Sequence, residues 1–278
     1  MTASLYIVAT PIGNLGDMTL RGLETLRQVD LIAAEDTRHS AKLLAHFDIR
    51  TPMVSYHDHS TSFDIEQLLR RLRAGESIAL ISDAGTPMVS DPGYRLVAAC
   101  RAESLPVVPI PGPSSMTAAL SVAGLPSDRF HFEGFLPVKL GQRSRRLKHL
   151  RSYEATLIFF ESPRRLVGAL EMMCSELGDR EAALCRELTK SHETIRRDKL
   201  SVLLEFVRSD ANQQRGEVVV LVRGFAQEES DVAPETWLWL ERLARELPPR
   251  RAAAIVADIT GLSARDLYQW LLEHRQET

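Results

Sequence analysis

The sequence has few cysteines and no long hydrophobic run, and both absences narrow the classes of protein that it can represent. Its three cysteines, Cys100, Cys174 and Cys185, are widely spaced and stand in helical or apolar contexts. This usage argues against a disulfide framework or a zinc site and suits a reducing cytoplasm. No apolar run approaches the roughly 20 residues that a membrane helix needs. A basic segment before the first apolar stretch is also lacking, so we expect no signal peptide.

A strong charge of one sign is absent as well. The net charge is −3, and 44% of the residues are hydrophobic and 26% charged, which is typical of soluble globular proteins. The overall charge argues against general affinity for nucleic acid. At 278 residues, the chain is expected to form two domains with an appendage.

The stretch Ala79–Gly93 predicts a buried parallel strand that ends in a ligand-binding loop. An apolar run gives way to a turn with two prolines and two glycines, and a helical segment follows from Tyr94. Open α/β sheets bind ligands at the carboxyl ends of their strands. The loop contains Asp83 and Asp91 but no lysine or arginine, so it suits a cationic or neutral ligand better than a phosphate. An ordinary strand-to-helix turn is the alternative interpretation.

Two earlier apolar stretches also end in residues that suit a binding edge. The predicted strand Leu5–Ala9 is followed by the loop Thr10–Asp17, whose glycine spacing is not the dinucleotide-binding G-x-G-x-x-G. The predicted strand Leu31–Ala34 ends in the charged run Glu35–Arg38. Charge at a strand end is expensive unless it is solvated, paired or used, so this position favours a function over plain surface charge.

The stretch Pro106–Ile110 is expected to deliver one more loop to the same edge. Ser114 or Ser115 can then cap a helix over Met116–Ala123. Free amides and hydroxyls at that helix start would suit a ligand carboxylate, although capping alone explains them equally well. Gly124–Asp128 follows as the predicted domain boundary.

The second half continues the alternation of strands and helices. The predicted strand Thr156–Phe160 ends in Glu161–Arg165, and Arg186–Glu193 is a dense set of acidic, basic and hydroxyl groups. Near the C-terminus, a helix–glycine–helix pattern is compatible with a helix-turn-helix-like unit or with a packing appendage. We therefore predict an N-terminal α/β domain, a second α/β domain and a helical module, at residues 1–123, 124–226 and 234–278.

A local excess of positive charge stands between residues 139 and 151. Six cations occur there without one acid: Lys139, Arg143, Arg145, Arg146, Lys148 and Arg151. A solvated helix face and a patch that binds a polyanion are both compatible with such a run.

The pattern His57-Asp58-His59 raises the question of a metal site. Residues i and i+2 of a strand share a face. No third ligand of suitable spacing follows, so a polar cleft wall or a surface loop is the preferred interpretation and no metal is predicted.

Seven ordered motifs resemble one known family. They are Thr10–Leu15, Ala34–Arg38, Ser82–Pro87 with Ser90–Gly93, Pro111–Ser114, Gly134–Pro137, Glu161–Arg164 and Glu187–Lys190. The family is the tetrapyrrole methylase-like, or class III, S-adenosylmethionine methyltransferases. The resemblance covers nearly the whole chain and implies a homodimer of two αβα domains per chain, with S-adenosylmethionine in the cleft between the domains. Within the family the chain is similar to the branch that methylates the ribose 2′-hydroxyl of a cytidine in the decoding region of 16S rRNA, which we expect to occur within the 30S subunit.

The resemblance also implies a set of cofactor contacts, and the charge and position of other residues suggest two further groups of site residues. Cofactor contacts are expected at Pro11, Asp83, Ala84, Gly85, Thr86, Pro87, Ser114 and Ser115, and at Phe160 and Glu161 of the second domain. Candidates for a base or a polarising cation are Glu35, Asp36, Arg38, Glu187, Lys190 and Glu193. Contacts to rRNA phosphates are expected from the six cations at 139–151, together with Arg164 and Arg165.

Two other functions are compatible with the same fold. A small-molecule methyltransferase acting on a precorrin-type tetrapyrrole would need neither the basic run nor the C-terminal helical module. A non-catalytic RNA-binding protein would have no use for charged motifs at four strand ends, because buried charge is costly. The sequence therefore favours an rRNA methyltransferase.

Overall fold

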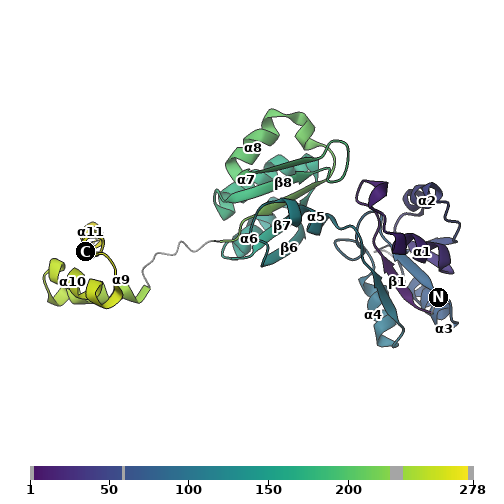
Figure 1. Cartoon of the computed structure of the whole chain (residues 1–278), viewed down its shortest axis with the longest axis horizontal. Helices are drawn as coiled ribbons and strands as arrows, with labels where there is room; N and C mark the ends of the chain where they lie inside the picture. Colours follow the sequence, from purple (N-terminus) through teal and green to yellow (C-terminus); the bar gives the residue numbers. More distant parts are fainter. Residues whose placement is uncertain (1–2, 58–59, 226–233, 275–278) are drawn as a thin grey trace. The chain divides into compact units, whose positions relative to one another are not determined.

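The computed structural model describes residues 3–57, 60–225 and 234–274. It divides into two compact units, at residues 1–225 and 226–278. The first unit contains two five-stranded sheets (Figure 1). Asp58 and His59 of the histidine pattern lie outside the described residues. In the part of the chain that is described, no helix is both long enough and apolar enough to cross a membrane.

The first sheet is entirely parallel, as the sequence predicts, with the strand order β3-β2-β4-β1-β5. Its strands are β1 (Leu5–Val8), β2 (Leu31–Ala34), β3 (Met53–Ser55), β4 (Ile78–Ile81) and β5 (Val107–Ile110). Successive residues of a strand point to opposite faces, so Leu5 and Ile7 pack on one side and Tyr6 and Val8 on the other.

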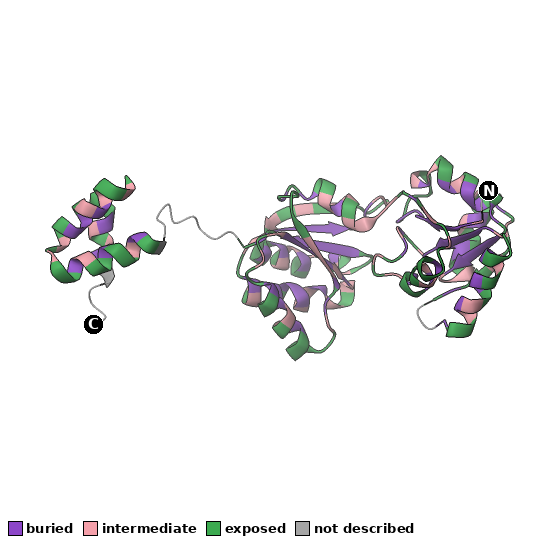
Figure 2. Ribbon diagram, turned by 90° about the horizontal axis from the view of Figure 1, so that it is seen from below, coloured by how far each residue is buried: buried purple, intermediate pink, exposed green. Residues whose placement is uncertain are grey.

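Helices cover both faces of this sheet. One core contains apolar side chains of α3 (Ser62–Arg73) and α4 (Tyr94–Ala102). The opposite core contains those of α1 (Leu20–Gln28) and α2 (Thr37–His46). Figure 2 shows the strands as the buried layer between these helices. The short 3₁₀ helix η1 (Leu15–Asp17) lies in the loop after β1.

The second sheet is mixed, with the order β6-β7-β10-β8-β9. Its strands are β6 (Phe130–Phe135), β7 (Thr156–Glu161), β8 (Glu181–Arg186), β9 (Thr194–Lys199) and β10 (Val218–Val222). The β6–β7 pair is parallel and the other three pairs are antiparallel. Helices α6 (Leu140–Leu150), α7 (Leu166–Leu177) and α8 (Leu200–Ser209) enclose a core on one face. Two further 3₁₀ helices are η2 (Pro163–Arg165) and η3 (Ala211–Gln214).

Helix α5 (Ser115–Val122) packs on the opposite face of the second sheet. Ala119 and Ala123 are buried there against Val219 and Leu221 of β10. The helix precedes the boundary that the sequence predicts at residues 123–124, yet its buried face contacts the later sheet. It begins at Ser115, one residue earlier than predicted, and the Ser114 side chain makes no capping hydrogen bond.

The second unit is a small bundle of α9 (Pro234–Glu246), α10 (Pro249–Thr260) and α11 (Ala264–His274). Leu240, Val256 and Leu267 form its core. The Trp237 and Trp270 rings are stacked with centroids 4.5 Å apart. The apolar side chains of α9 thus form a packing surface within the bundle.

The core of the second sheet gives a stability prediction. Phe159 is fully buried among α6, α7 and the neighbouring strands, so Phe159→Ala should lower the free energy of unfolding of the first unit by about 3–5 kcal/mol. The matched variant Phe130→Ala removes a side chain that is 45% exposed and should lower it by much less. Urea unfolding followed by circular dichroism measures both, and equal losses would contradict this description of the core.

Candidate active site

Loops at the carboxyl edge of the first sheet are fastened to one another through their backbones. Thr10 and Gly85 exchange backbone hydrogen bonds of 2.9 and 3.0 Å, which pair the loops after β1 and β4. The Thr86 hydroxyl donates to the Pro113 carbonyl at 2.9 Å and so connects the loops after β4 and β5. Gly85 has a φ of +80°, a conformation that glycine adopts without strain.

Two carboxylates connect the loops after β2 and β4. Asp83 Oδ1 accepts a hydrogen bond from the backbone N–H of Asp36 at 3.1 Å. Glu35 Oε2 accepts one from the backbone N–H of Asp83 at 3.3 Å. Each loop therefore supplies a carboxylate to an amide of the other. Part of the charge at these strand ends serves to hold the loops in place.

A cavity of about 320 Å³, here called the first cavity, is lined by loops of the first sheet and by strands of the second. Much of its wall is apolar, formed by Ile12, Phe135, Phe160, Leu188 and Val219. The Phe135 and Phe160 rings meet edge to face with centroids 5.7 Å apart. Such a wall suits a flat, apolar part of a ligand.

Glu161, at the end of β7, is the buried acid of the first cavity. Its side chain is fully buried, and Oε1 receives a salt bridge from Arg165 and the backbone N–H of Ser162, at 2.6 and 2.7 Å. Oε2 is also buried and has no hydrogen-bond partner among the described residues. Buried carboxylate oxygens normally have a donor, so the cavity is suited to a ligand that carries one.

A second cavity, of about 310 Å³, adjoins the first. Ile12, Ala84 and Glu217 line both cavities. Its remaining wall comes from loops of the first sheet, from α2 and from Lys190. Two ligands bound in these cavities would therefore meet at the residues that the cavities share.

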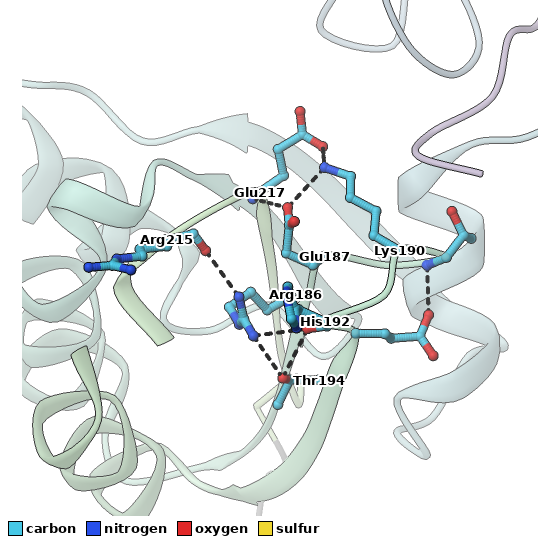
Figure 3. Close-up of polar contacts among 9 residues, drawn as sticks. Arg186, Glu187, Lys190, His192, Thr194, Arg215 and Glu217 are labelled. Carbon is cyan, nitrogen blue, oxygen red and sulfur yellow. Dashed lines mark hydrogen bonds and ion pairs between the residues drawn. The ribbon is translucent and has the colours of Figure 1, made fainter. Parts of the chain in front are cut away.

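Lys190 lies at this junction between two carboxylates. Its Nζ donates to Glu187 Oε1 and to Glu217 Oε2, each at 2.9 Å (Figure 3). The backbone N–H of Glu217 also donates to Glu187 Oε1 at 2.9 Å. The group thereby joins the loop after β8 to the residue that precedes β10.

Two glycines make room for this group. A Cβ at Gly13 would collide with the Lys190 side chain, which crosses the loop after β1. A Cβ at Gly216 would collide with the Glu187 carboxyl, and Gly216 also has a φ of +80°. Close approach of a charged side chain to backbone is one of the uses of glycine.

Both partners of the Glu187–Lys190 pair have shifted pKa values. Burial disfavours the charge of Lys190, but its hydrogen bonds to Glu187 and Glu217 outweigh burial, so the lysine pKa lies above its usual value. Burial also disfavours ionised Glu187, but hydrogen bonds from Lys190 and from the Glu217 amide keep the Glu187 pKa below its usual value. Lys190 is therefore a cation at neutral pH and is unsuited to be a base.

Arg186 is a buried arginine that holds the loop after β8 and the segment before β10 by hydrogen bonds. It is 6% exposed, and its guanidinium donates to the Gln213 side chain, the His192 carbonyl and the Thr194 hydroxyl at 3.0, 2.9 and 3.2 Å. A longer bond of 3.4 Å reaches the Arg215 carbonyl (Figure 3). Among the described residues it has no carboxylate partner, so its charge is stabilised by neutral acceptors.

Three other candidates from the sequence have local partners. Asp36 is the N-cap of α2 and accepts hydrogen bonds from the side chain and backbone of Arg38, which lower the Asp36 pKa to about 2. Glu193 Oε2 accepts the backbone N–H of Thr189 at 2.7 Å. These side chains shape the loops, whereas Lys190 lines the second cavity and, like Glu187, contacts Glu217, which lines both cavities.

The structure distributes the expected cofactor residues over three positions. Ala84, Ser115, Phe160 and Glu161 line the first cavity, and Pro11, Asp83 and Ala84 line the second. Ser114 lines a third, more open cavity. Gly85, Thr86 and Pro87 line none of the three and instead shape the loop that carries Asp83 and Ala84.

The basic run differs from its sequence-based description. Arg143 is 4% exposed and donates to the Pro137 carbonyl. Arg146 pairs with Glu133 at 2.6 Å, and Lys148 approaches Glu176 at 3.9 Å. The run contains no acid of its own, but acids distant in sequence thus supply partners for Arg146 and Lys148.

Four expected phosphate contacts are exposed and have no ion pair within the described part of the chain: Lys139, Arg145, Arg151 and Arg164. Arg165 differs from them, since it is bound to Glu161 and donates to the Leu136 carbonyl at 3.2 Å.

Comparison with known proteins agrees with this architecture. The family model described as Tetrapyrrole (Corrin/Porphyrin) Methylases matches residues 4–204. The chain belongs to this family. A second model, described as RsmI C-terminal HTH domain, matches residues 231–275. The resemblance inferred from the seven motifs is confirmed.

A named relative matches nearly the whole chain, and solved structures with a similar fold match 79% of it. The protein of Vibrio cholerae named ribosomal RNA small subunit methyltransferase I is 49% identical over 275 residues, which cover 98% of this chain and 96% of the relative. Among solved structures, a diphthine synthase has a TM-score of 0.59 at 16% identity, covering 79% of this chain and 89% of its own. A uroporphyrin-III C-methyltransferase from Thermus thermophilus, complexed with S-adenosylhomocysteine, has a TM-score of 0.53 at 21% identity, covering 79% and 97%.

Several residues of the site are not marked by any pattern in the sequence. Glu217 precedes a clear strand and is a single acid in an ordinary turn, so no pattern marked it. His39 and Lys42 line the second cavity, although nothing in the helical sequence of α2 separates them from surface residues. Arg186 was part of the dense charged segment, but its burial was not foreseen.

The Glu187–Lys190 pair predicts a particular dependence of stability on pH. Its contribution should be complete between the ordinary pKa values of about 4.5 for glutamate and 10.5 for lysine. It should be lost as the pH falls through the lowered pKa of Glu187 or rises through the raised pKa of Lys190. Urea unfolding of the unaltered chain and of Lys190→Met should thus give a difference that is constant near neutrality and shrinks at both extremes.

Lys199→Met is the matched control for this measurement, because Lys199 is an exposed lysine outside both cavities. Its difference from the unaltered chain should not follow the same curve. A Lys190→Met difference that changes between about pH 6 and pH 9 would contradict the description of the pair.

Proposed function

We propose that the chain methylates RNA of the small ribosomal subunit with S-adenosylmethionine as methyl donor. More specifically, the acceptor is the ribose 2′-hydroxyl of a cytidine in the decoding region of 16S rRNA. The observation that carries the proposal is the 49% identity, over nearly the full length, to a relative named ribosomal RNA small subunit methyltransferase I.

The chemistry of the first cavity fits the proposed donor. Bound S-adenosylmethionine supplies a methyl group made electrophilic by a positively charged sulfur. Asp91 and Glu161 line the cavity, and its described lining contains no lysine or arginine, which suits a ligand with cationic groups. The unpartnered Oε2 of Glu161 can accept a hydrogen bond from an ammonium or a hydroxyl, and Phe160 and Leu188 offer an apolar slot for the adenine.

Lys190 is assigned the role of a fixed cation beside the acceptor oxygen. A ribose hydroxyl is a weak nucleophile at neutral pH, and negative charge develops on its oxygen as it attacks. An ammonium already held by two carboxylates can stabilise that charge without reorganisation. Alignment of the reactants can lower the barrier by about 7–11 kcal/mol. A general base typically accelerates a reaction by about 10²–10⁴-fold, which corresponds to about 3–5 kcal/mol. Alignment is therefore the larger effect.

The proposal extends to the context of the reaction. We infer a homodimer that acts in the cytoplasm on RNA within the 30S subunit. The exposed cations Lys139, Arg145, Arg151 and Arg164 would contact phosphates around the target, since phosphate contacts position an RNA without reading its sequence.

Methyl transfer tests the function directly. The chain is incubated with labelled S-adenosylmethionine and with 30S subunits that lack their own modification, and free 16S rRNA and a precorrin-type tetrapyrrole serve as parallel acceptors. The expected result is label on the 2′-oxygen of a decoding-region cytidine. Label on the tetrapyrrole alone would show that the substrate is a tetrapyrrole and not rRNA. Cofactor binding without any methyl transfer would favour a non-catalytic role.

Replacement of Lys190 tests its role in the same assay. Lys190→Met should lower kcat by about 10²–10³-fold, the usual effect of removing one stabilising donor, while the affinity for S-adenosylmethionine stays close to that of the unaltered chain. Lys199→Met should retain full turnover. Loss of cofactor affinity with normal kcat at saturation would show that Lys190 serves the donor instead.

A further inference from the structure

We propose that the second cavity binds one unpaired nucleotide of the RNA, with its phosphate at His39 and Lys42 of α2. The inference rests on the proposed function, because it names the place of the methyl acceptor in that reaction. The residues of α2 were not among those that the sequence marked for RNA contact.

The first argument is the contact between the two cavities. Transfer of a methyl group requires donor and acceptor atoms about 3–3.5 Å apart. Ile12, Ala84 and Glu217 line both cavities, so ligands that fill them can approach each other at these residues. With the donor in the first cavity, the second is the place from which an acceptor can reach it.

The lining of the second cavity matches the parts of a nucleotide. Leu15 and Leu43 provide apolar surface for a base. Asp83 and Glu217 provide carboxylates that can accept hydrogen bonds from ribose hydroxyls. Lys190 lines this cavity beside Glu217, a residue of both cavities that its Nζ contacts at 2.9 Å, and the oxygen that receives the methyl group would lie near it.

Lys42 supplies positive charge for the phosphate, and the His39 ring can supply a second hydrogen-bond donor. They are three residues apart on α2 and therefore share a face of the helix. Both are exposed, and neither has a hydrogen-bond or ion-pair partner for its side chain among the described residues. Arg38 of the same helix is paired with Asp36 at 3.0 Å. Arg38, which does not line the cavity, is thus neutralised, whereas the Lys42 cation and the His39 ring remain available to an anion.

The size of the cavity favours a single nucleotide. About 310 Å³ is at the lower end of the range for small-ligand sites, and it cannot enclose a base pair. Bases of single-stranded loops can be turned out of their stack and bound individually, which is the common mode of sequence-specific RNA recognition. The acceptor is therefore an unpaired residue of the RNA.

The test separates binding of RNA from binding of the donor. Lys42→Ala should raise KM for unmethylated 30S subunits by about five- to tenfold with little change in kcat. The variant should also lose about one phosphate contact. The slope of the logarithm of the binding constant against the logarithm of the salt concentration should therefore become less steep by roughly 0.7–1. The affinity for S-adenosylmethionine, measured by calorimetry, should stay constant. Lys199→Ala is the control that removes the same side chain outside both cavities.

A variant in the first cavity gives the reciprocal result. Glu161→Gln should weaken S-adenosylmethionine binding and leave the KM for 30S subunits near that of the unaltered chain. The inference is overturned if Lys42→Ala weakens binding of S-adenosylmethionine, or if the KM and the salt slope of this variant equal those of Lys199→Ala. If the unaltered chain transfers no methyl group to any RNA, the proposed function fails first, and the inference fails with it.

Discussion

The placement of one ammonium group constrains much of the site. Lys190 can sit at the junction of the two cavities only because Glu187 and Glu217 hold its charge at 2.9 Å on either side. Its aliphatic stem passes over Gly13 and so belongs to the wall of the first sheet's loops, although its backbone belongs to the second sheet. The packing of this stem over Gly13 is thus also a contact between the two halves of the first unit. Arg186 is buried next to Glu187 and holds the loop after β8 and the segment before β10 through hydrogen bonds to neutral acceptors.

The charged groups at the strand ends divide into two kinds. Glu35, Asp36 and Glu193 direct their oxygens to backbone amides and fix the loops. Glu161 keeps one oxygen buried and unpartnered among the described residues. A buried acceptor without a donor destabilises a fold. The unpartnered oxygen of Glu161 is therefore best explained by a bound ligand that donates the hydrogen bond. The same distinction separates Arg38, which is paired, from Lys42, which is not.

Local sequence was enough for the features that depend on neighbours along the chain. The all-parallel first sheet followed from apolar runs that end in glycine, proline and acidic residues, and Lys190 and Glu187 were recognised within one motif. The ion pairs of the basic run could not be predicted locally, because the partners of Arg146 and Lys148 are Glu133 on β6 and Glu176 on α7. Such pairing depends on tertiary packing, which no inspection of residues 139–151 can supply. Glu217 is distinguished only by its contact with Lys190 and its place in the wall of both cavities, so its surrounding sequence could not identify it.

The position of α5 has a consequence for the chain as an evolutionary and folding unit. This helix follows the last strand of the first sheet, yet Ala119 and Ala123 are buried against β10 of the second. A fragment that ended near residue 123 would carry an apolar helix without its support, and the complementary fragment would expose the face of its sheet. The two halves are therefore interdependent, and exchange of one half between relatives would have to preserve the surface that α5 covers.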